Sequence, residues 1–188
     1  MTALLEAVAS ADRWLSAIYH LELGLRAEQF VMPLEDARSL LPADAPRSGV
    51  VVRDDGAELE LGLYVDPRDG ADPDTIVEET SHLLCLAWHA VHDRRVSLLI
   101  LELQGEVDRW AVARLQGRDP FRHFENFRWA AGMNSVTRRL YATAHQVGLR
   151  YCRSLARRFP HLADTPALLS ELRRFYRASS EAKLRVVS

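Results

Sequence analysis

The chain has 188 residues, of which 48% are hydrophobic and 27% charged, and its formal net charge is −2. This composition is typical of a soluble globular protein with a single domain. The sequence contains no apolar run of the roughly 20 residues that a membrane helix needs. The acidic N-terminal segment lacks the basic region of a signal peptide, and the two cysteines are isolated, so we expect a cytoplasmic protein without disulfides, a thiolate zinc site or a membrane partner.

Residues 1–48 are predicted to form N-terminal helices. Apolar residues recur at helical spacing from Leu4 to about Met32, where Pro33 ends the pattern. The following PLEDARSLL begins with a proline, which is typical of the first position of a short helix.

Residues 49–66 are predicted to form a β-hairpin. Leu59, Leu61 and Leu63 alternate with polar residues or glycine, and the preceding Asp-Asp-Gly is a typical hairpin turn. Because two strands are marginally stable alone, we expect the three leucines to pack on the helices.

Residues 72–116 are predicted to form a central hairpin of two antiparallel helices, 73–92 and 96–116. Asp72 can cap the first helix, with Pro73 at its first position, and Asp-Arg-Arg at 93–95 interrupts the pattern. The start of the second segment, residues 96–103, is apolar enough for a buried strand, but its length and later spacing favour a helix.

Residues 117–188 are predicted to form a basic helical part. An aromatic stretch, FRHFENFRW, precedes a long helix capped by Asn134 or Ser135, and a last amphipathic helix follows Pro166. The chain is therefore expected to be one α+β domain, mainly α, with a central antiparallel helix hairpin and one β-hairpin.

Four potential ligand side chains are predicted to meet in the central hairpin. If its helices fold back at 93–95, His82 lies across from Glu106. Glu79 is one turn from His82, and Glu102 is one turn from Glu106, so all four converge in one layer. Gly105 would allow the helices to approach closely.

Three carboxylates crowded in an apolar space must protonate, pair with arginine or bind a cation. One imidazole with several carboxylates suits zinc, iron or manganese, so Glu79, His82, Glu102 and Glu106 are predicted to bind a divalent metal, with Glu79 and Glu106 as acid–base groups. Glu79 and His82 form a Glu-x-x-His element like that of di-iron helical bundles, but the second copy that those bundles require is absent. The alternative is that these residues form the polar faces of two ordinary helices.

Charge is distributed unequally along the chain. Residues 1–108 contain 8 Arg against 21 Asp and Glu, whereas residues 109–188 contain 16 Arg and Lys against 5 acids. Basic residues with aromatic neighbours are typical of nucleic-acid contact, and the row on the long helix comprises Arg139, Arg150, Arg153 and Arg157. Alternatively, these arginines pair with the acidic half, within one chain or between the subunits of a homo-oligomer.

The leading hypothesis is thus a metal-binding helical protein, and if it is an enzyme, a metal-dependent hydrolase. The alternative is a non-catalytic binding module or assembly subunit that presents its arginine-rich C-terminal face to nucleic acid or an acidic protein partner.

Overall fold

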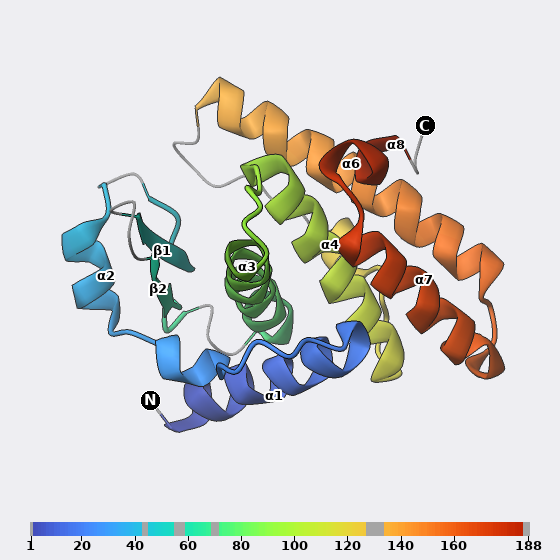
Figure 1. Ribbon diagram of the computed structural model, residues 1–188, viewed down its shortest axis with the longest axis horizontal. Coiled ribbons are helices and arrows are strands. Elements are labelled where there is room, and N and C mark those ends of the chain that lie inside the picture. Colours follow the sequence, from blue (N-terminus) through green and yellow to red (C-terminus); the bar gives the residue numbers. More distant parts are fainter. Residues whose placement is uncertain (1, 43–44, 55–58, 69–71, 127–133, 186–188) are drawn as a thin grey trace.

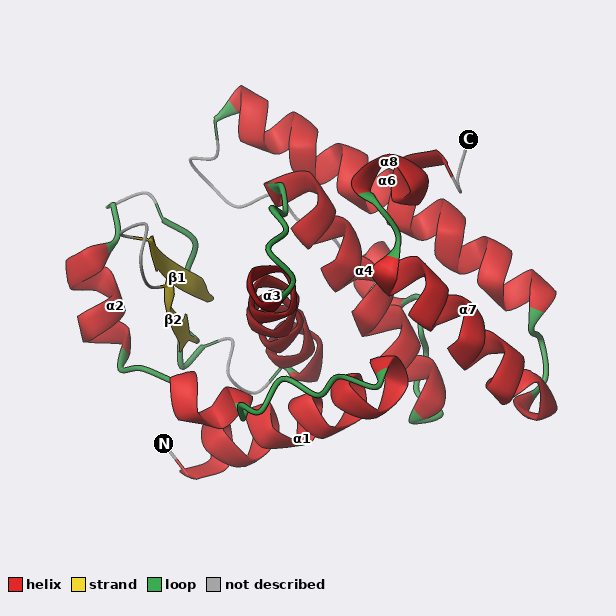
Figure 2. Cartoon of the chain, viewed as in Figure 1, coloured by secondary structure: helices red, strands yellow, loops and turns green. Residues whose placement is uncertain are grey.

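The structure is a computed structural model that describes residues 2–42, 45–54, 59–68, 72–126 and 134–185. In chain order its elements are α1 (Thr2–Tyr19), the 3-10 helix η1 (Ala27–Phe30), α2 (Leu34–Leu40), β1 (Gly49–Asp54), β2 (Leu59–Tyr64), α3 (Pro73–Val91), α4 (Leu98–Leu115), α5 (Arg122–Glu125), α6 (Ser135–Arg158), the 3-10 helix η2 (Leu162–Asp164), α7 (Thr165–Arg177) and α8 (Ser180–Arg185). The predicted fold class, α+β and mainly α, is confirmed, and Figure 2 shows how strongly helix dominates the described chain.

The helix α3 lies near the centre of the molecule. Figure 1 shows β1, β2 and α2 on one side of α3, with α4, α6 and α7 on the other. The helix α4 packs against both α3 and α6, so it is buried between two layers. No helix among the described residues combines the length and the apolar composition required to cross a membrane.

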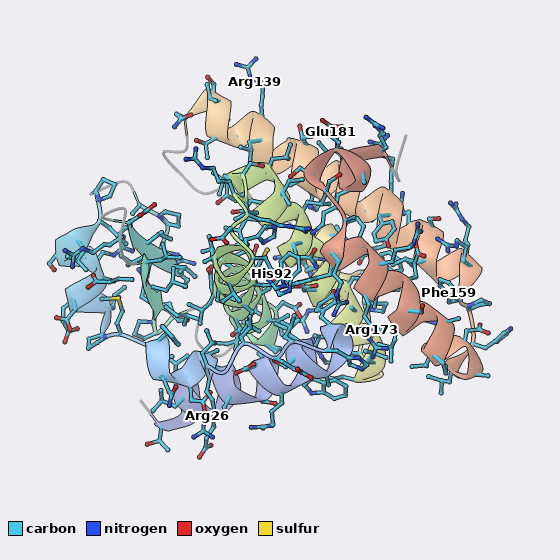
Figure 3. All side chains as sticks on the ribbon, viewed as in Figure 1. Arg26, His92, Arg139, Phe159, Arg173 and Glu181 are labelled. Carbon is cyan, nitrogen blue, oxygen red and sulfur yellow. The ribbon has the colours of Figure 1, made fainter. Side chains whose placement is uncertain are left out.

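The first helix is shorter than its apolar spacing predicts. Instead of continuing to Met32, α1 ends at Tyr19, because His20 adopts a left-handed backbone conformation with a φ of 51°. Two arginines of α7 stabilise this end: Arg173 Nε donates to Ile18 O at 2.7 Å, and an Arg177 guanidinium nitrogen donates to Tyr19 O at 2.7 Å. Arg173 lies beside α1 in Figure 3.

The β-hairpin is confirmed, with β1 and β2 antiparallel and Val50 opposite Leu63. Its predicted packing is confirmed only in part, since Leu63 is fully buried but Leu59 is 40% exposed at the far end of the hairpin. The predicted turn falls largely on residues 55–58, outside the described residues.

The central helix hairpin is confirmed, and residues 98–103 are helical. Asp72 caps α3 by accepting hydrogen bonds from the backbone of Asp74 and Thr75, and Ser97 caps α4. These local signals explain why the chain starts each helix at these points.

The predicted long helix of the basic part is α6, which Asn134 caps by accepting from two backbone N–H groups. Its apolar face buries Ala144, Val147, Tyr151 and Leu155. Residues 127–133, which include the end of the aromatic stretch, lie outside the described residues.

A buried polar network joins four helices behind the central hairpin. The carboxylate of Asp108 in α4 accepts hydrogen bonds from Tyr19, from Ser81 at 2.5 Å and from Gln104 at 2.8 Å. Gln104 in turn accepts from Lys183 Nζ at 2.8 Å, and this lysine, the only one in the chain, is 1% exposed. The network therefore fixes α8 onto α4.

Some of the opposite charges do pair within the chain. Arg109 binds Glu78 and Arg118 binds Asp74, which are both contacts between the basic and acidic parts. The alternative explanation of the charge asymmetry, intrachain pairing, therefore accounts for these two arginines.

Candidate metal centre

The interface of α3 and α4 brings the predicted acids and the histidine to one level. Glu78 lies opposite Arg109, and Ser81 lies opposite Asp108, which is close to the predicted register of the hairpin. Gly105 leaves space for the imidazole, because a Cβ atom at this position would lie 3.0 Å from His82 Nε2.

Three side chains in this interface could hold one cation. Each of Glu78, His82 and Glu102 offers a ligand atom, and these atoms all lie within 4.8 Å of one another. The Nε2 atom of His82 is 3.9 Å from Oε2 of Glu102, and it is buried without a hydrogen-bond partner. A buried nitrogen without a partner is costly unless something else satisfies it, and a cation would do so.

Glu79 contacts the other side of the same imidazole. Its Oε2 atom lies 3.4 Å from His82 Nδ1, and the Glu79 residue is only 7% exposed. Ligand histidines commonly have a carboxylate on the second ring nitrogen, which sets the tautomer and the ring orientation. The structure thus gives Glu79 the geometry of an orienting group for His82.

Glu106 lies in a neighbouring cluster, which Arg109 joins to Glu78 by pairing with both carboxylates. Its carboxylate is 3.0 Å from a guanidinium nitrogen of Arg109, 3.2 Å from His123 Nε2 and 3.0 Å from His145 Nδ1. Of the four residues predicted to converge, Glu79, His82 and Glu102 are brought together, whereas Glu106 faces α5 and α6.

Burial and neighbouring charges shift the proton affinities of the site. Burial raises the pKa of Glu78 to about 7 against the opposing effect of Arg109, and it also raises the pKa of Glu102. Burial alone would lower the pKa of His82, but the carboxylates of Glu102 and Glu79 outweigh it and raise the pKa to about 9. The negative charge of these carboxylates is therefore compensated by a proton on His82, and a metal ion that replaces this proton would supply the same compensation.

In the Glu106 cluster, positively charged neighbours outweigh the effect of burial on the carboxylate pKa. Burial would raise the pKa of Glu106, but Arg109, His123 and His145 together lower it well below its usual range. Burial lowers the pKa of His123 despite its contact with Glu106. Glu106 is therefore an ionised carboxylate occupied by its own partners.

The candidate centre opens into a cavity of about 870 Å³. Glu78, His82 and Glu102 line it together with Tyr141 of α6, and burial together with the nearby Glu102 carboxylate raises the pKa of the Tyr141 hydroxyl. Strand β1 lines part of the same cavity, and the lining also includes apolar residues of α3 and α4 together with Arg109, Arg122 and His123. A cation bound here would thus be accessible to a small or extended molecule.

Comparison with family models, with curated proteins and with solved structures finds no match. The site must therefore be interpreted from its own geometry.

Sequence reasoning did not identify Glu78, His123, His145 and Tyr141 as site residues. Glu78 adjoins Glu79, and either could face α4, so only the actual rotation of α3 decides between them. His123 and His145 belong to α5 and α6, and no local spacing connects them with residues of the central hairpin.

The predicted arginine row is exposed along α6. Arg139, Arg150, Arg153 and Arg157 are all exposed, and Figure 3 shows Arg139 directed outward near the start of this helix. Within the described part of the chain none of the four has an ion pair. Arg158, the next residue after this row, instead pairs with Glu171 of α7.

Proposed function

We propose that this protein is a metal-dependent hydrolase whose divalent cation is bound by Glu78, His82 and Glu102. The observation that carries the proposal is the convergence of three ligand atoms, from the half-buried Glu78 and the buried His82 and Glu102, within 4.8 Å of one another at the wall of a large cavity. Three protein ligands leave coordination positions for water and substrate, which is the arrangement of catalytic rather than structural metal sites.

The ligand types support zinc, iron or manganese, because two carboxylates and one imidazole offer hard and borderline donors without thiolate. A divalent metal held by Glu78, His82 and Glu102 would act as a Lewis acid and activate water for hydrolysis of an ester, amide or phosphoester. Glu79 would orient His82, replacing the ligand role predicted for it from the sequence.

Glu106 retains a role as a positioning residue in this proposal. Its carboxylate holds His123, which lines the same cavity and whose lowered pKa leaves the imidazole neutral near pH 7. A neutral imidazole can accept a proton from water or donate one through its protonated form to a leaving group.

Elemental analysis tests the proposal directly. Purified full-length protein equilibrated with zinc, iron or manganese and then desalted should retain about one ion per chain. His82→Ala and Glu102→Gln should lose it, whereas Glu181→Gln, which changes an exposed acid of α8, should retain it. A wild-type protein without bound metal under all three conditions overturns the proposal.

A second candidate function is supported by the arginine row. Four exposed guanidinium groups on one helix, without ion pairs to described residues, provide a surface for phosphate groups or carboxylates of a partner. In this second candidate function the protein is a non-catalytic binding module that binds nucleic acid or an acidic protein, and the binding does not require the metal.

A further inference from the structure

One of the strands that line the cavity, β1, has an open edge. Val50 and Val52 of β1 line the same cavity as Glu78, His82 and Glu102. In the described sheet β1 has one neighbour, β2, so its second edge has no strand partner.

The direction of the free backbone groups follows from the pairing register. The backbone N–H of Met32 donates to Leu63 O at 2.8 Å, on the side of β2 away from β1. In an antiparallel pair, two residues directly opposite one another form one of two kinds of pair. Either both direct their N–H and C=O groups toward each other, or both direct these groups away from each other. Val50 is opposite Leu63, and Val52 is two residues further along, so both direct these groups away from β2.

These outward groups have no partner within the part of the chain that the structure describes. The backbone hydrogen bonds outside regular elements include none to Val50 or Val52. An edge with free donors and acceptors is a template for another extended chain.

We propose that the cavity binds an extended peptide segment, which pairs with the open edge of β1 and presents a peptide bond to the Glu78–His82–Glu102 centre. The proposed function supplies the chemistry, and this inference names its substrate class. Strand addition of this kind gives affinity through main-chain hydrogen bonds and selectivity through pockets for alternate side chains.

A peptide backbone matches the edge better than a phosphoester does. Each outward residue of β1 offers one N–H donor and one C=O acceptor, and only a ligand with alternating acceptors and donors satisfies both. A phosphate group offers acceptors and would leave the carbonyl oxygens of Val50 and Val52 unpaired. Apolar residues on the α3–α4 side of the cavity, Leu86, Leu98 and Leu101, provide contacts for apolar side chains.

The reaction is hydrolysis of one amide bond. The oxygen of water bonds to the carbonyl carbon, and the C–N bond breaks. One proton of the water passes to the leaving nitrogen, and the other is released from the new carboxylic acid. No oxidant, reductant or further reactant is needed.

Two variants of one residue test the edge pairing. Val52→Pro removes an outward N–H without removing a donor to β2, whereas Val52→Ala keeps that N–H and shortens a side chain that is 46% exposed. The zinc-loaded full chain is incubated with a pool of N-acetylated octapeptides, and products are identified by mass spectrometry. We expect Val52→Pro to cleave about tenfold more slowly than Val52→Ala, because only the proline removes the outward N–H.

A change in the peptide provides a test that does not depend on a folded variant. A cleaved peptide is resynthesised with N-methyl groups at alternate residues, in each of the two possible registers. Because a strand uses every second residue for pairing with one neighbour, one register should lose cleavage and the other should retain it.

Two results would overturn the inference while leaving the metal site intact. One is metal-loaded protein that cleaves no peptide in the pool, and the other is equal loss, or no loss, with both N-methyl registers. If the wild type binds no metal, the proposed hydrolase fails, and binding of the octapeptide pool by the metal-free wild type, compared with that by Val52→Pro and Val52→Ala, decides the edge pairing separately.

Discussion

Between α3 and α4, the Nε2 atom of His82 lies 3.9 Å from the Oε2 atom of Glu102. This separation is too long for a hydrogen bond, but it suits two ligands of one ion, since two atoms each about 2.1 Å from a metal lie at most about 4.2 Å apart. The other ring nitrogen of His82 faces Glu79. The imidazole is therefore held between a candidate ligand on one side and an orienting carboxylate on the other.

This arrangement predicts different effects for the two glutamates. Glu102→Gln should abolish stoichiometric metal binding, whereas Glu79→Gln should weaken affinity by about 10–100-fold and retain the site. Competition with a chromogenic chelator measures both affinities, with Glu181→Gln as the control. Equal losses in the Glu79 and Glu102 variants would instead make Glu79 a ligand, as its sequence spacing predicts.

The rotation of α4 explains why the sequence predicts only part of this site. Glu102 and Glu106 are one turn apart, and their spacing predicts a shared face. Because α4 is buried between α3 and α6, the small angular offset between the two directs Glu102 toward His82 and Glu106 toward His145. A helix buried on two sides has no polar face from which its orientation could be inferred.

The fold follows more directly from local signals. Asp72 with Pro73 starts α3, Asn134 starts α6, and the alternating leucines form β2. The end of α1 is the exception, because Arg173 and Arg177 act on it from more than 150 residues away in the sequence. Position 20 is a histidine rather than a helix-ending proline or glycine, so the sequence alone does not predict that α1 ends here. The contacts with α7 override the helical spacing of the apolar residues.

The α7 arginines should therefore contribute to stability rather than to ligand binding. Arg173→Ala and Arg177→Ala each remove a hydrogen bond from a charged donor to a helix-end carbonyl, and each should lower the free energy of unfolding by about 1–2 kcal/mol. Arg157→Ala, on the exposed face of α6, is the matched control and should change it by less than about 0.5 kcal/mol. Urea unfolding followed by circular dichroism measures the three variants. Equal effects at the three positions would contradict the assigned contacts.

Asp108 should make stability depend on pH. Its burial raises its pKa to about 6, although Ser81, Tyr19 and Gln104 donate hydrogen bonds that act in the opposite direction. The ordinary value is 3.8, so between about pH 4 and pH 6 the folded chain binds more protons than the unfolded chain. The free energy of unfolding should therefore fall as pH rises through this window, by up to about 3 kcal/mol from this group.

Asp108→Asn removes this titration and should flatten the curve between pH 4 and pH 6. The raised pKa of Glu78 also makes the free energy of unfolding fall with rising pH, at somewhat higher pH. Because this contribution is present in both proteins, the difference between the wild type and Asp108→Asn isolates Asp108. Asp93→Asn removes one exposed acid from the turn between α3 and α4 and controls for the change in net charge. Parallel curves for the wild type and Asp108→Asn would show that the Asp108 carboxyl is not perturbed by burial.

The arginine row of α6 makes a prediction that is independent of the metal. If this helix binds a polyanion, the logarithm of affinity for a mixed single-stranded and double-stranded DNA pool should fall linearly with the logarithm of salt concentration. Arg150→Ala with Arg153→Ala should reduce that slope by roughly 1–2, because each arginine lost removes about one phosphate contact. Arg174→Ala is the control, since this guanidinium is already paired with Glu171. A slope that is the same for the wild type and the double variant would show that α6 is not the contact surface, and binding that persists in the Glu102→Gln variant would separate this activity from the metal centre.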